Sequence, residues 1–285
     1  MGENKSICII DGYNMIHRCR FEWGGGMATT PNKIIYNFFR TLRSTVSNGD
    51  YDLVYFVTEG RPSHRLQMDK NYKANRIATD LTDEEVEYWS LFHEQKRFII
   101  DLIADYFPIV VANHPEYEGD DLVYSLIKNN HPLDDVEIIS SDTDFIQILN
   151  EFPETVRLYN PISKAYRGNT SYDYVTWKAM VGDKSDNIPG VPRIGKKTAT
   201  KILETPGELD RRKGDFNFNN AFNSSYELIK LSSMDGDFGS VVFSDSFLDS
   251  NEIRKSFNLM NFSFSNDDGS WAKYIETFYN LLEKK

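Results

Sequence analysis

The sequence has few cysteines and no long apolar segment. Only Cys8 and Cys19 occur among its 285 residues, which excludes a small fold held together by disulfides. The N-terminus shows no apolar signal region, and no apolar run approaches the ~18 residues of a membrane helix. We therefore expect a cytoplasmic protein without membrane contact, in which Cys8 is a buried thiol.

The chain also lacks an excess of positive charge. It has 32 Lys and Arg against 43 Asp and Glu, giving a formal net charge of −11 at pH 7, which argues against a general nucleic-acid coat. A nucleic-acid enzyme is not excluded, because local charge decides such binding. Residues 61–76 hold five Lys or Arg against one acid, and residues 193–201 hold four against none.

Short apolar runs alternate with segments of helical spacing in the first 180 residues. A long helix is predicted to begin after Thr82, where Glu85 completes a capping box. This alternation predicts an α/β domain over residues 1–180, with a central, mainly parallel sheet flanked by helices. The strand signal fades beyond Gly182, so residues 181–285 are expected to form a smaller helical region. The predicted strands are 6–10, 53–57, 109–112 and 136–140, with a hairpin over 156–167.

Nine carboxylates fall in five tight clusters, several of them directly after buried strands or at the start of a helix. Any single cluster is explained by helix capping or by the helix dipole. Asp183 fits this explanation poorly, because it follows a predicted helix end, where the dipole disfavours an anion. The carboxyl ends of parallel strands meet at one edge of a sheet, and Mg²⁺ or Mn²⁺ prefer such oxygen ligands. We therefore predict one metal site formed by Asp11, Glu59, Glu118, Asp120, Asp121, Asp142, Asp144, Asp183 and Asp186.

Two basic segments are candidates for phosphate contact. Lys73 and Arg76 lie just ahead of the long helix, with Tyr72 available to stack on a base, although a solvated charged surface is an equally good interpretation. The second segment reads G-V-P-R-I-G-K-K-T-A, where two glycines bracket a turn that leads into a helix. It would contact a phosphate backbone through Gly190, Val191, Arg193, Gly195, Lys196, Lys197 and Thr198.

The carboxylate series, followed by G-D-x-x-D-N and G-V-x-x-I-G-x-K-T-A, resembles the flap endonuclease or 5′-nuclease family. The resemblance runs from about Ile7 to Leu203 and is greatest to the small 5′ exonucleases of bacteriophages and bacteria and to the 5′-nuclease domains of bacterial DNA polymerase I. It implies a PIN-like nuclease fold with a helical arch over about residues 73–107. A helix–hairpin–helix motif at about residues 186–204 would grip duplex DNA.

The resemblance also implies roles for individual residues. The nine acids except Glu59 match the metal-binding acids of the family, which hold two or more Mg²⁺ ions. Lys73 and Arg76 match residues that assist cleavage, and we add Asp11 to this catalytic set. The hairpin of the family often holds K⁺. The expected substrate is DNA with 5′ ends or flaps, with RNA–DNA hybrids as a further substrate, cut by a monomer in replication or repair alongside replication proteins.

Two departures and three rival interpretations accompany this resemblance. Glu59 stands where the family usually has Asp, and Arg193 where Gly is usual. A PIN-type ribonuclease would share the sheet and the acids but should lack the hairpin. A haloacid-dehalogenase-like phosphatase needs an acid where Tyr13 stands. A non-catalytic DNA-structure-binding protein would be free to lose acids, which this chain keeps.

Overall fold

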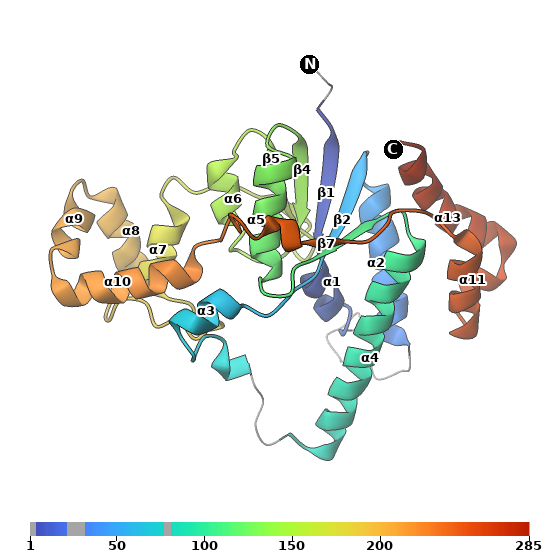
Figure 1. Cartoon of the computed structure of the whole chain (residues 1–285), viewed down its shortest axis with the longest axis horizontal. Coiled ribbons are helices and arrows are strands. Elements are labelled where there is room, and N and C mark those ends of the chain that lie inside the picture. Colours follow the sequence, from blue (N-terminus) through green and yellow to red (C-terminus); the bar gives the residue numbers. More distant parts are fainter. Residues whose placement is uncertain (1–3, 22–31, 77–80, 285) are drawn as a thin grey trace.

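A computed structural model describes residues 4–21, 32–76 and 81–284. Its centre is a seven-stranded sheet in the order β6-β5-β4-β1-β2-β3-β7 (Figure 1). The five inner strands are parallel, and the outer strands β6 and β7 are antiparallel to their neighbours. The prediction of a mainly parallel sheet flanked by helices is confirmed. The strands are β1 (Ser6–Asp11), β2 (Leu53–Val57), β3 (Val110–Asn113), β4 (Asp135–Ile139), β5 (Val156–Asn160), β6 (Ala165–Arg167) and β7 (Val242–Phe243).

Strand order reverses beside β1. The chain proceeds from β1 to β2 and β3 on one side, then crosses to β4 and β5 on the other. Open α/β sheets bind ligands at the carboxyl ends of their strands, at the position of such a reversal. Asp11 ends β1 at this position, and Ser140 follows β4 next to it.

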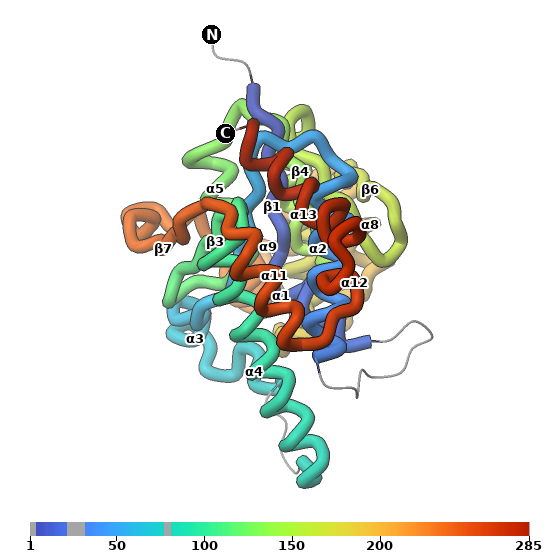
Figure 2. The backbone as a smooth tube through the Cα atoms, turned by 90° about the vertical axis from the view of Figure 1, so that its right-hand side faces the viewer, coloured from blue at the N-terminus to red at the C-terminus, as the bar shows by residue number. Residues whose placement is uncertain are grey.

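Helices cover both faces of the sheet, and the alternation of side chains along β1 shows the two layers. Ile7 and Ile9 face a core that contains the α5 side chains, whereas Cys8 and Ile10 face the core of the opposite layer. The first layer contains α5 (Gly119–Asn130) and α6 (Ile146–Glu151). The second contains α1 (Gly12–Arg18), α2 (Lys33–Ser47) and α4 (Asp83–Tyr106), followed by α11 (Ser250–Leu259), α12 (Ser263–Asn266) and α13 (Asp268–Glu283) (Figure 2).

A third, smaller core lies at one end of the molecule, at the left of Figure 1. Ile202 and Phe222 are buried in it, together with Tyr72 from the segment that follows α3 (Ser63–Met68). This core joins α7 (Tyr174–Val181), α8 (Lys196–Glu204), α9 (Glu208–Lys213) and α10 (Phe216–Ile229).

The structure corrects the expectation that residues 181–285 form one helical region. Among the helices of this region, α8 to α10 belong to the third core, which they share with α7. Residues 242–243 return to the sheet, and Phe257 and Phe278 from α11 and α13 pack into the core of the second layer. The polar stretch 216–225, which has no assignment from sequence, lies in α10.

The long helix is confirmed as α4, with the capping box of Thr82 and Glu85 in place. The stretch 73–107 that the resemblance assigns to an arch contains η1 (Ala74–Arg76) and α4, and its residues 77–80 lie outside the described residues. No helix among the described residues has both the length and the hydropathy needed to cross a bilayer.

Candidate functional site

Most of the predicted acids meet in one cleft at the carboxyl edge of the sheet. The cleft has a volume of about 150 Å³ and is polar. Glu118 lies beside it, within 4.8 Å of Asp120 measured between carboxylate oxygens. The fold thus brings together acids that are more than a hundred residues apart in the sequence, such as Asp11 and Asp186. The acids that line the cleft are Asp11, Glu59, Asp120, Asp142, Asp144, Asp183 and Asp186.

Local hydrogen bonds fix the first of these carboxylates. Asp11 is the N-cap of α1 and accepts from the backbone N–H of Asn14 at 3.1 Å, while the Ser140 hydroxyl donates to its other oxygen at 2.7 Å. On the next loop, the backbone N–H of Asp144 donates to Asp142 at 2.9 Å. The two bonds to Asp11 use one oxygen each and the bond to Asp142 uses one of its two oxygens, and both side chains line the cleft.

A tight turn presents Asp183 and Asp186. Asp183 exchanges two backbone hydrogen bonds with Ile188, of 2.9 and 2.7 Å, which closes the loop between them. Gly182 and Gly190 both have positive φ, of 80° and 70°, and pack so closely that a Cβ on Gly190 would lie 2.5 Å from the nitrogen of Gly182. Glycine is required at both positions because larger residues meet strain and backbone contact.

Two groups of acids have the spacing of metal ligands. The oxygens of Glu118, Asp120 and Asp121 lie within 4.8 Å of one another. The same holds for Asp144, Asp183 and Asp186. All are hard oxygen donors, which suit Mg²⁺, Mn²⁺ or Ca²⁺ better than soft metals, so the cleft fits divalent cations.

The electrostatics of the cleft also favour a bound cation. Burial raises the pKa of Asp11, Glu59 and Asp144 to about 7 in each case, and the neighbouring carboxylates Asp142, Asp120 and Glu118 add to the effect. Burial opposes ionisation of Asp183 as well, but hydrogen bonds from Lys178 and Ser185 outweigh it and lower its pKa to about 2. Crowded acids of this kind take up either protons or cations.

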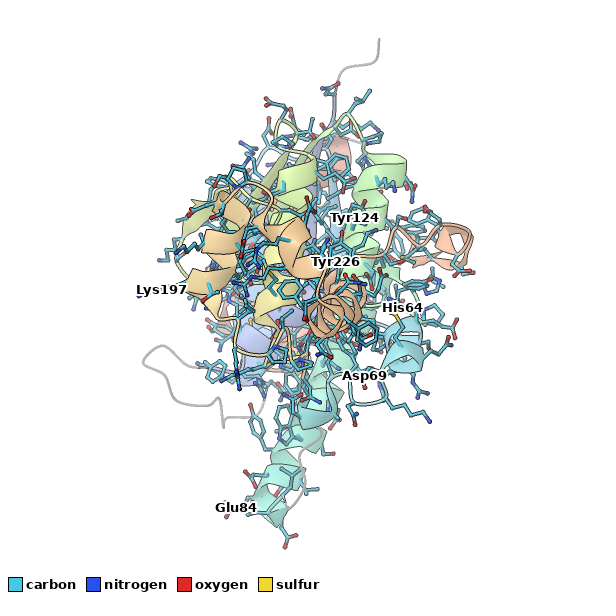
Figure 3. All side chains as sticks on the ribbon, turned by 90° about the vertical axis from the view of Figure 1, so that its left-hand side faces the viewer. His64, Asp69, Glu84, Tyr124, Lys197 and Tyr226 are labelled. Atoms are coloured by element: carbon cyan, nitrogen blue, oxygen red, sulfur yellow. The ribbon has the colours of Figure 1, made fainter. Side chains whose placement is uncertain are left out.

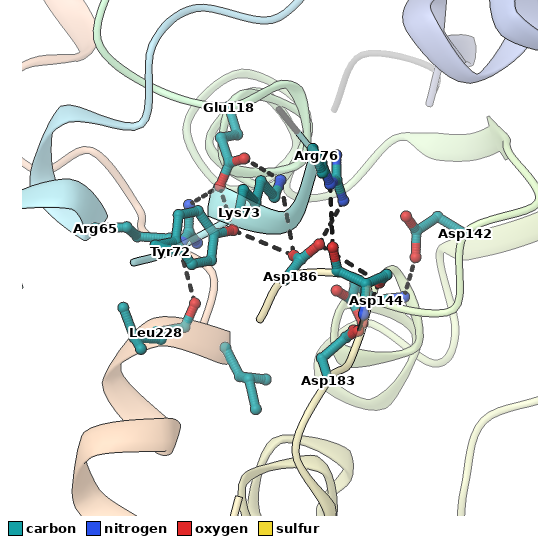
Figure 4. Close-up of polar contacts among 12 residues, drawn as sticks. Arg65, Tyr72, Lys73, Arg76, Glu118, Asp142, Asp144, Asp183, Asp186 and Leu228 are labelled. Carbon is teal, nitrogen blue, oxygen red and sulfur yellow. Dashed lines mark hydrogen bonds and ion pairs between the residues drawn. The ribbon is translucent and has the colours of Figure 1, made fainter. Parts of the chain in front are cut away.

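Three basic side chains lie among the acids, and Figure 4 labels two of them, Lys73 and Arg76. Lys73 pairs with Glu118 and lies 3.7 Å from Asp186, while Arg76 pairs with Asp186. Lys178, from α7, pairs with Asp144 and lies 2.6 Å from Asp183. The sequence analysis missed Lys178. Its one signal was a lone lysine within the apolar run V-T-W-K-A-M-V of α7.

One predicted metal ligand is already occupied by a protein partner. Asp121 is fully buried and accepts from both terminal nitrogens of Arg65, at 2.5 and 2.8 Å, and from the Ser232 backbone N–H at 2.8 Å. It does not line the cleft, although one oxygen lies near Glu118 and Asp120. Its geometry is that of a structural ion pair, and Arg65 was the partner that sequence reasoning missed.

The prediction that Tyr72 stacks on a base is corrected by its burial. The Tyr72 side chain is 4% exposed, and its hydroxyl donates to Glu118 at 2.8 Å. A ring buried in the third core, with the cations of Arg65 and Lys73 5.9 and 5.2 Å from its centroid, is not accessible to a base. It acts instead as a polar link between Glu118 and Asp186, which its hydroxyl reaches at 3.3 Å.

The predicted DNA-contacting turn connects α7 to α8. Gly195 is the N-cap of α8, and Lys196, Lys197 and Thr198 follow it on an exposed surface, with Lys197 at the outer edge of the region (Figure 3). Val191 is buried, so its side chain is not available to a ligand, and its backbone N–H and carbonyl bond to Met180 and Ile194. Arg193, where the family usually has Gly, has a φ of 66°, in the left-handed region that favours glycine. DNA contact by these residues remains a prediction.

Comparison with known structures gives the same fold. The flap endonuclease of bacteriophage T5, in a complex with DNA and metal ions, matches with a TM-score of 0.64 and 19% identity over 98% of this chain and 100% of that chain. Human GEN1, in complex with Holliday junction DNA, matches with a TM-score of 0.56 and 13% identity, covering 98% of this chain and 72% of that chain.

Sequence comparison identifies relatives that are much longer. DNA polymerase I of Streptococcus pneumoniae is 30% identical over 230 residues, and that of Caldicellulosiruptor bescii is 32% identical over 225 residues. These matches cover 73% and 72% of this chain but only 25% of each polymerase, so the chain spans about a quarter of the relatives' length.

Two family models match the chain itself. The C-terminal SAM fold of the 5′-3′ exonucleases matches residues 170–221, which include α7 to α9 and the start of α10. The N-terminal resolvase-like domain of the same family matches residues 6–181, which is more than half of the chain and includes strands β1 to β6 and most of the acidic cleft. The chain therefore belongs to the 5′-3′ exonuclease family.

Proposed function

We propose that this chain is a structure-specific 5′ nuclease, acting as a 5′-3′ exonuclease and flap endonuclease that hydrolyses DNA phosphodiesters near 5′ ends. The observation that carries the proposal is the cleft in which Asp11, Asp142 and Asp186 meet beside Lys73 and Arg76. Its setting in a family of 5′-3′ exonucleases supports the reaction class. We further propose that the enzyme acts in the cytoplasm, in replication or repair.

The two groups of acids are proposed to hold two Mg²⁺ ions, for which Mn²⁺ can substitute. Glu118 and Asp120 supply one set of oxygens, and Asp144, Asp183 and Asp186 supply the other. Asp11, Glu59 and Asp142 also line the cleft and add to its negative charge. Divalent ions in such a site lower the pKa of water and stabilise the departing oxygen.

Lys73 and Arg76 are proposed to bind the phosphate at which cleavage occurs. The Arg76 side chain is 51% exposed and that of Lys73 is 20% exposed, so both have access to solvent at the cleft. Each is held by an acid of the site, Lys73 by Glu118 and Arg76 by Asp186. Fixed cations beside a phosphate stabilise the negative charge that develops during displacement.

The turn between α7 and α8 is proposed to bind the duplex. The N-terminus of α8, with the exposed Lys196 and Lys197, presents backbone N–H groups and positive charge to a phosphate. Such contacts read the backbone and not the bases, so cleavage would follow DNA structure. K⁺ at this turn, RNA–DNA hybrid substrates, a monomeric enzyme and replication partners are further parts of the proposal.

A labelled flap substrate tests the activity. The full chain is incubated with a 5′-labelled flap duplex in Mg²⁺ or in EDTA, and product lengths are mapped. We expect cleavage near the junction of single and double strand in Mg²⁺, none in EDTA, and none with Asp144→Asn. Cleavage that persists in EDTA, or at full rate in the Asp144→Asn variant, would refute the proposed use of the cleft.

A further inference from the structure

A second cavity lies in the second layer, between α2 and the helices α12 and α13. It has a volume of about 570 Å³ and shares no lining residue with the acidic cleft. Figures 1 and 2 place α13 beside α2, at the opposite end of the molecule from α8 to α10. We name it the α2–α13 pocket, which is lined by Tyr36, Arg40, Arg43, Ser44, Phe264, Ser270, Lys273 and Tyr274.

The charge of this pocket is opposite to that of the chain. Its charged lining residues are Arg40, Arg43 and Lys273, and no acid lines it within the described part of the chain. The protein as a whole carries a formal charge of −11. Three cations that line one pocket repel one another and attract an anion. Asp267, which interacts with Lys273, lies outside the lining and accepts from the Ser270 backbone N–H at 2.7 Å.

Arg43 is held in place but not fully bonded. Its Nη2 donates to the backbone carbonyl of Lys273 at 2.8 Å, and its guanidinium lies 5.9 Å from the ring centroid of Tyr274. Its Nε–H is buried and has no partner in the structure. A buried donor without an acceptor costs free energy, so a shift of the Arg43 side chain that brings this N–H to an acceptor oxygen in the pocket would be favourable.

Besides the three cations and two serines, the lining of the pocket consists of aromatic side chains. Phe264 lies between the rings of Tyr36 and Tyr274, with centroid distances of 6.2 and 4.8 Å. The Tyr274 hydroxyl donates to the Phe39 carbonyl at 3.2 Å, which fixes that ring. Aromatic faces stack with bases and sugars whatever the base identity.

We propose that the α2–α13 pocket binds a nucleotide. Arg40, Arg43 and Lys273 receive its phosphate, since arginine forks match phosphate oxygens. The half-buried rings of Tyr36 and Phe264 contact its nucleoside, while the buried Tyr274 supports them. The volume lies within the range of small-molecule sites. The nucleotide is either free or part of a nucleic-acid strand, since both present the same phosphate and base. This inference does not depend on the proposed nuclease activity.

Calorimetric titration of the full chain in metal-free buffer tests the pocket, because without divalent ions the acidic cleft repels phosphate. The probes are dTMP, inorganic phosphate as competitor, and a dT8 oligonucleotide. The variants are Arg40→Gln/Arg43→Gln and, in case that protein folds poorly, Ser44→Glu, which keeps both arginines. The charge-matched control is Arg157→Gln/Lys164→Gln, which alters two exposed residues outside both sites.

We expect dTMP or dT8 to bind the wild type and the control with the same dissociation constant. The pocket variants should bind the same probe with a dissociation constant at least ~10-fold higher than that of the wild type. Binding of dTMP that phosphate displaces would identify a free nucleotide as the ligand. Binding of dT8 alone would identify a strand. The proposal is overturned if neither probe binds the wild type at millimolar concentration, or if both pocket variants bind the probes as the wild type does.

Discussion

Arg65 and Asp121 form a bidentate ion pair in the interior, with nitrogen–oxygen distances of 2.5 and 2.8 Å. Arg65 is 1% exposed, and its remaining contacts are to Glu118 at 2.7 Å and to the carbonyls of Leu228 and Lys230 at 2.9 and 3.2 Å. One guanidinium therefore connects an acid of the candidate metal site to the end of α10, in the third core (Figure 4).

This pair predicts opposite behaviour for two adjacent acids. Asp121→Asn should lower the free energy of unfolding by about 3 kcal/mol, because the buried charge of Arg65 would keep only Glu118 as its counter-ion, and Glu118 also pairs with Lys73. Its effect on metal affinity should be small.

Asp120→Asn should weaken metal binding at least ~10-fold, because a ligand is lost. It should cost little stability, because the substitution relieves repulsion between carboxylates. Urea unfolding and Mn²⁺ titration of both variants measure this. Loss of metal binding in Asp121→Asn without loss of stability would show that Asp121 is a ligand.

A second prediction concerns Lys178, whose side chain is 9% exposed and pairs with Asp144 and Asp183. Its ammonium neutralises the same oxygens that a metal ion would use. Lys178→Met should therefore lower the stability of the metal-free protein by about 2 kcal/mol, because two partly buried carboxylates lose their counter-ion. The same variant should bind Mn²⁺ about tenfold more tightly.

Lys184→Met is the matched control, since Lys184 is an exposed lysine on the same loop as Asp183. It should change neither property. If Lys178→Met bound Mn²⁺ as the wild type does, or more weakly, Lys178 would not compete with the metal.

The parts of the fold that sequence predicted are those set by local chemistry. The capping box of Thr82 and Glu85 and the acids after β1 and β4 depend on neighbours within a few residues. The edge of the sheet then gathers Asp11 and Asp142, because parallel strands end together.

The unpredicted parts depend on contacts between distant segments. The ion pair of Arg65 and Asp121 spans 56 residues, and the bond from Tyr72 to Glu118 spans 46. An aromatic residue beside two cations is typical of a site that stacks on a base, which is why Tyr72 was predicted to do so. Its burial depends on the packing of α7 to α10 around it, which the sequence does not reveal. Likewise β7 has two residues and is a strand only because β3 offers an unpaired edge.

Arg193 allows backbone strain to be separated from charge. Its φ of 66° costs a non-glycine residue about 1 kcal/mol, so Arg193→Gly should stabilise the protein by roughly that amount. Arg193→Ala removes the charge but keeps the strain, and should not stabilise the protein.

If Arg193 contacts a phosphate, both variants should bind duplex DNA more weakly, and the salt dependence of their DNA binding should fall by about one ion. Thermal unfolding and DNA binding at several salt concentrations measure the two effects. Equal stability of the two variants would contradict the strain.

His17 predicts a specific pH dependence. Burial, followed by the charges of Arg20 and Lys96, lowers the pKa of His17 to about 4. An unfolded histidine titrates near pH 6.5, so the unfolded chain binds more protons between these values. The contribution of His17 to stability is therefore complete above pH 6.5 and is lost as the pH falls toward 4.

The comparison with His17→Gln isolates this contribution, because the buried carboxylates titrate in both proteins. From pH 7 to pH 5 the wild type should lose about 1 kcal/mol more stability than the variant, a value discounted for partial exposure. An NMR titration should show His17 neutral at pH 5.5. A measured pKa near 6.5 would contradict the environment described for this ring.

The claim on which this account depends is that acids distant in sequence bind divalent ions together. Electron paramagnetic resonance of Mn²⁺ counts the ions bound to the wild type and to Asp186→Asn. We predict about two ions per wild-type chain, one fewer in the variant, and a loss of flap cleavage of at least ~10³-fold. A wild type that binds no Mn²⁺, or an Asp186→Asn variant that binds and cuts as the wild type does, would contradict the account.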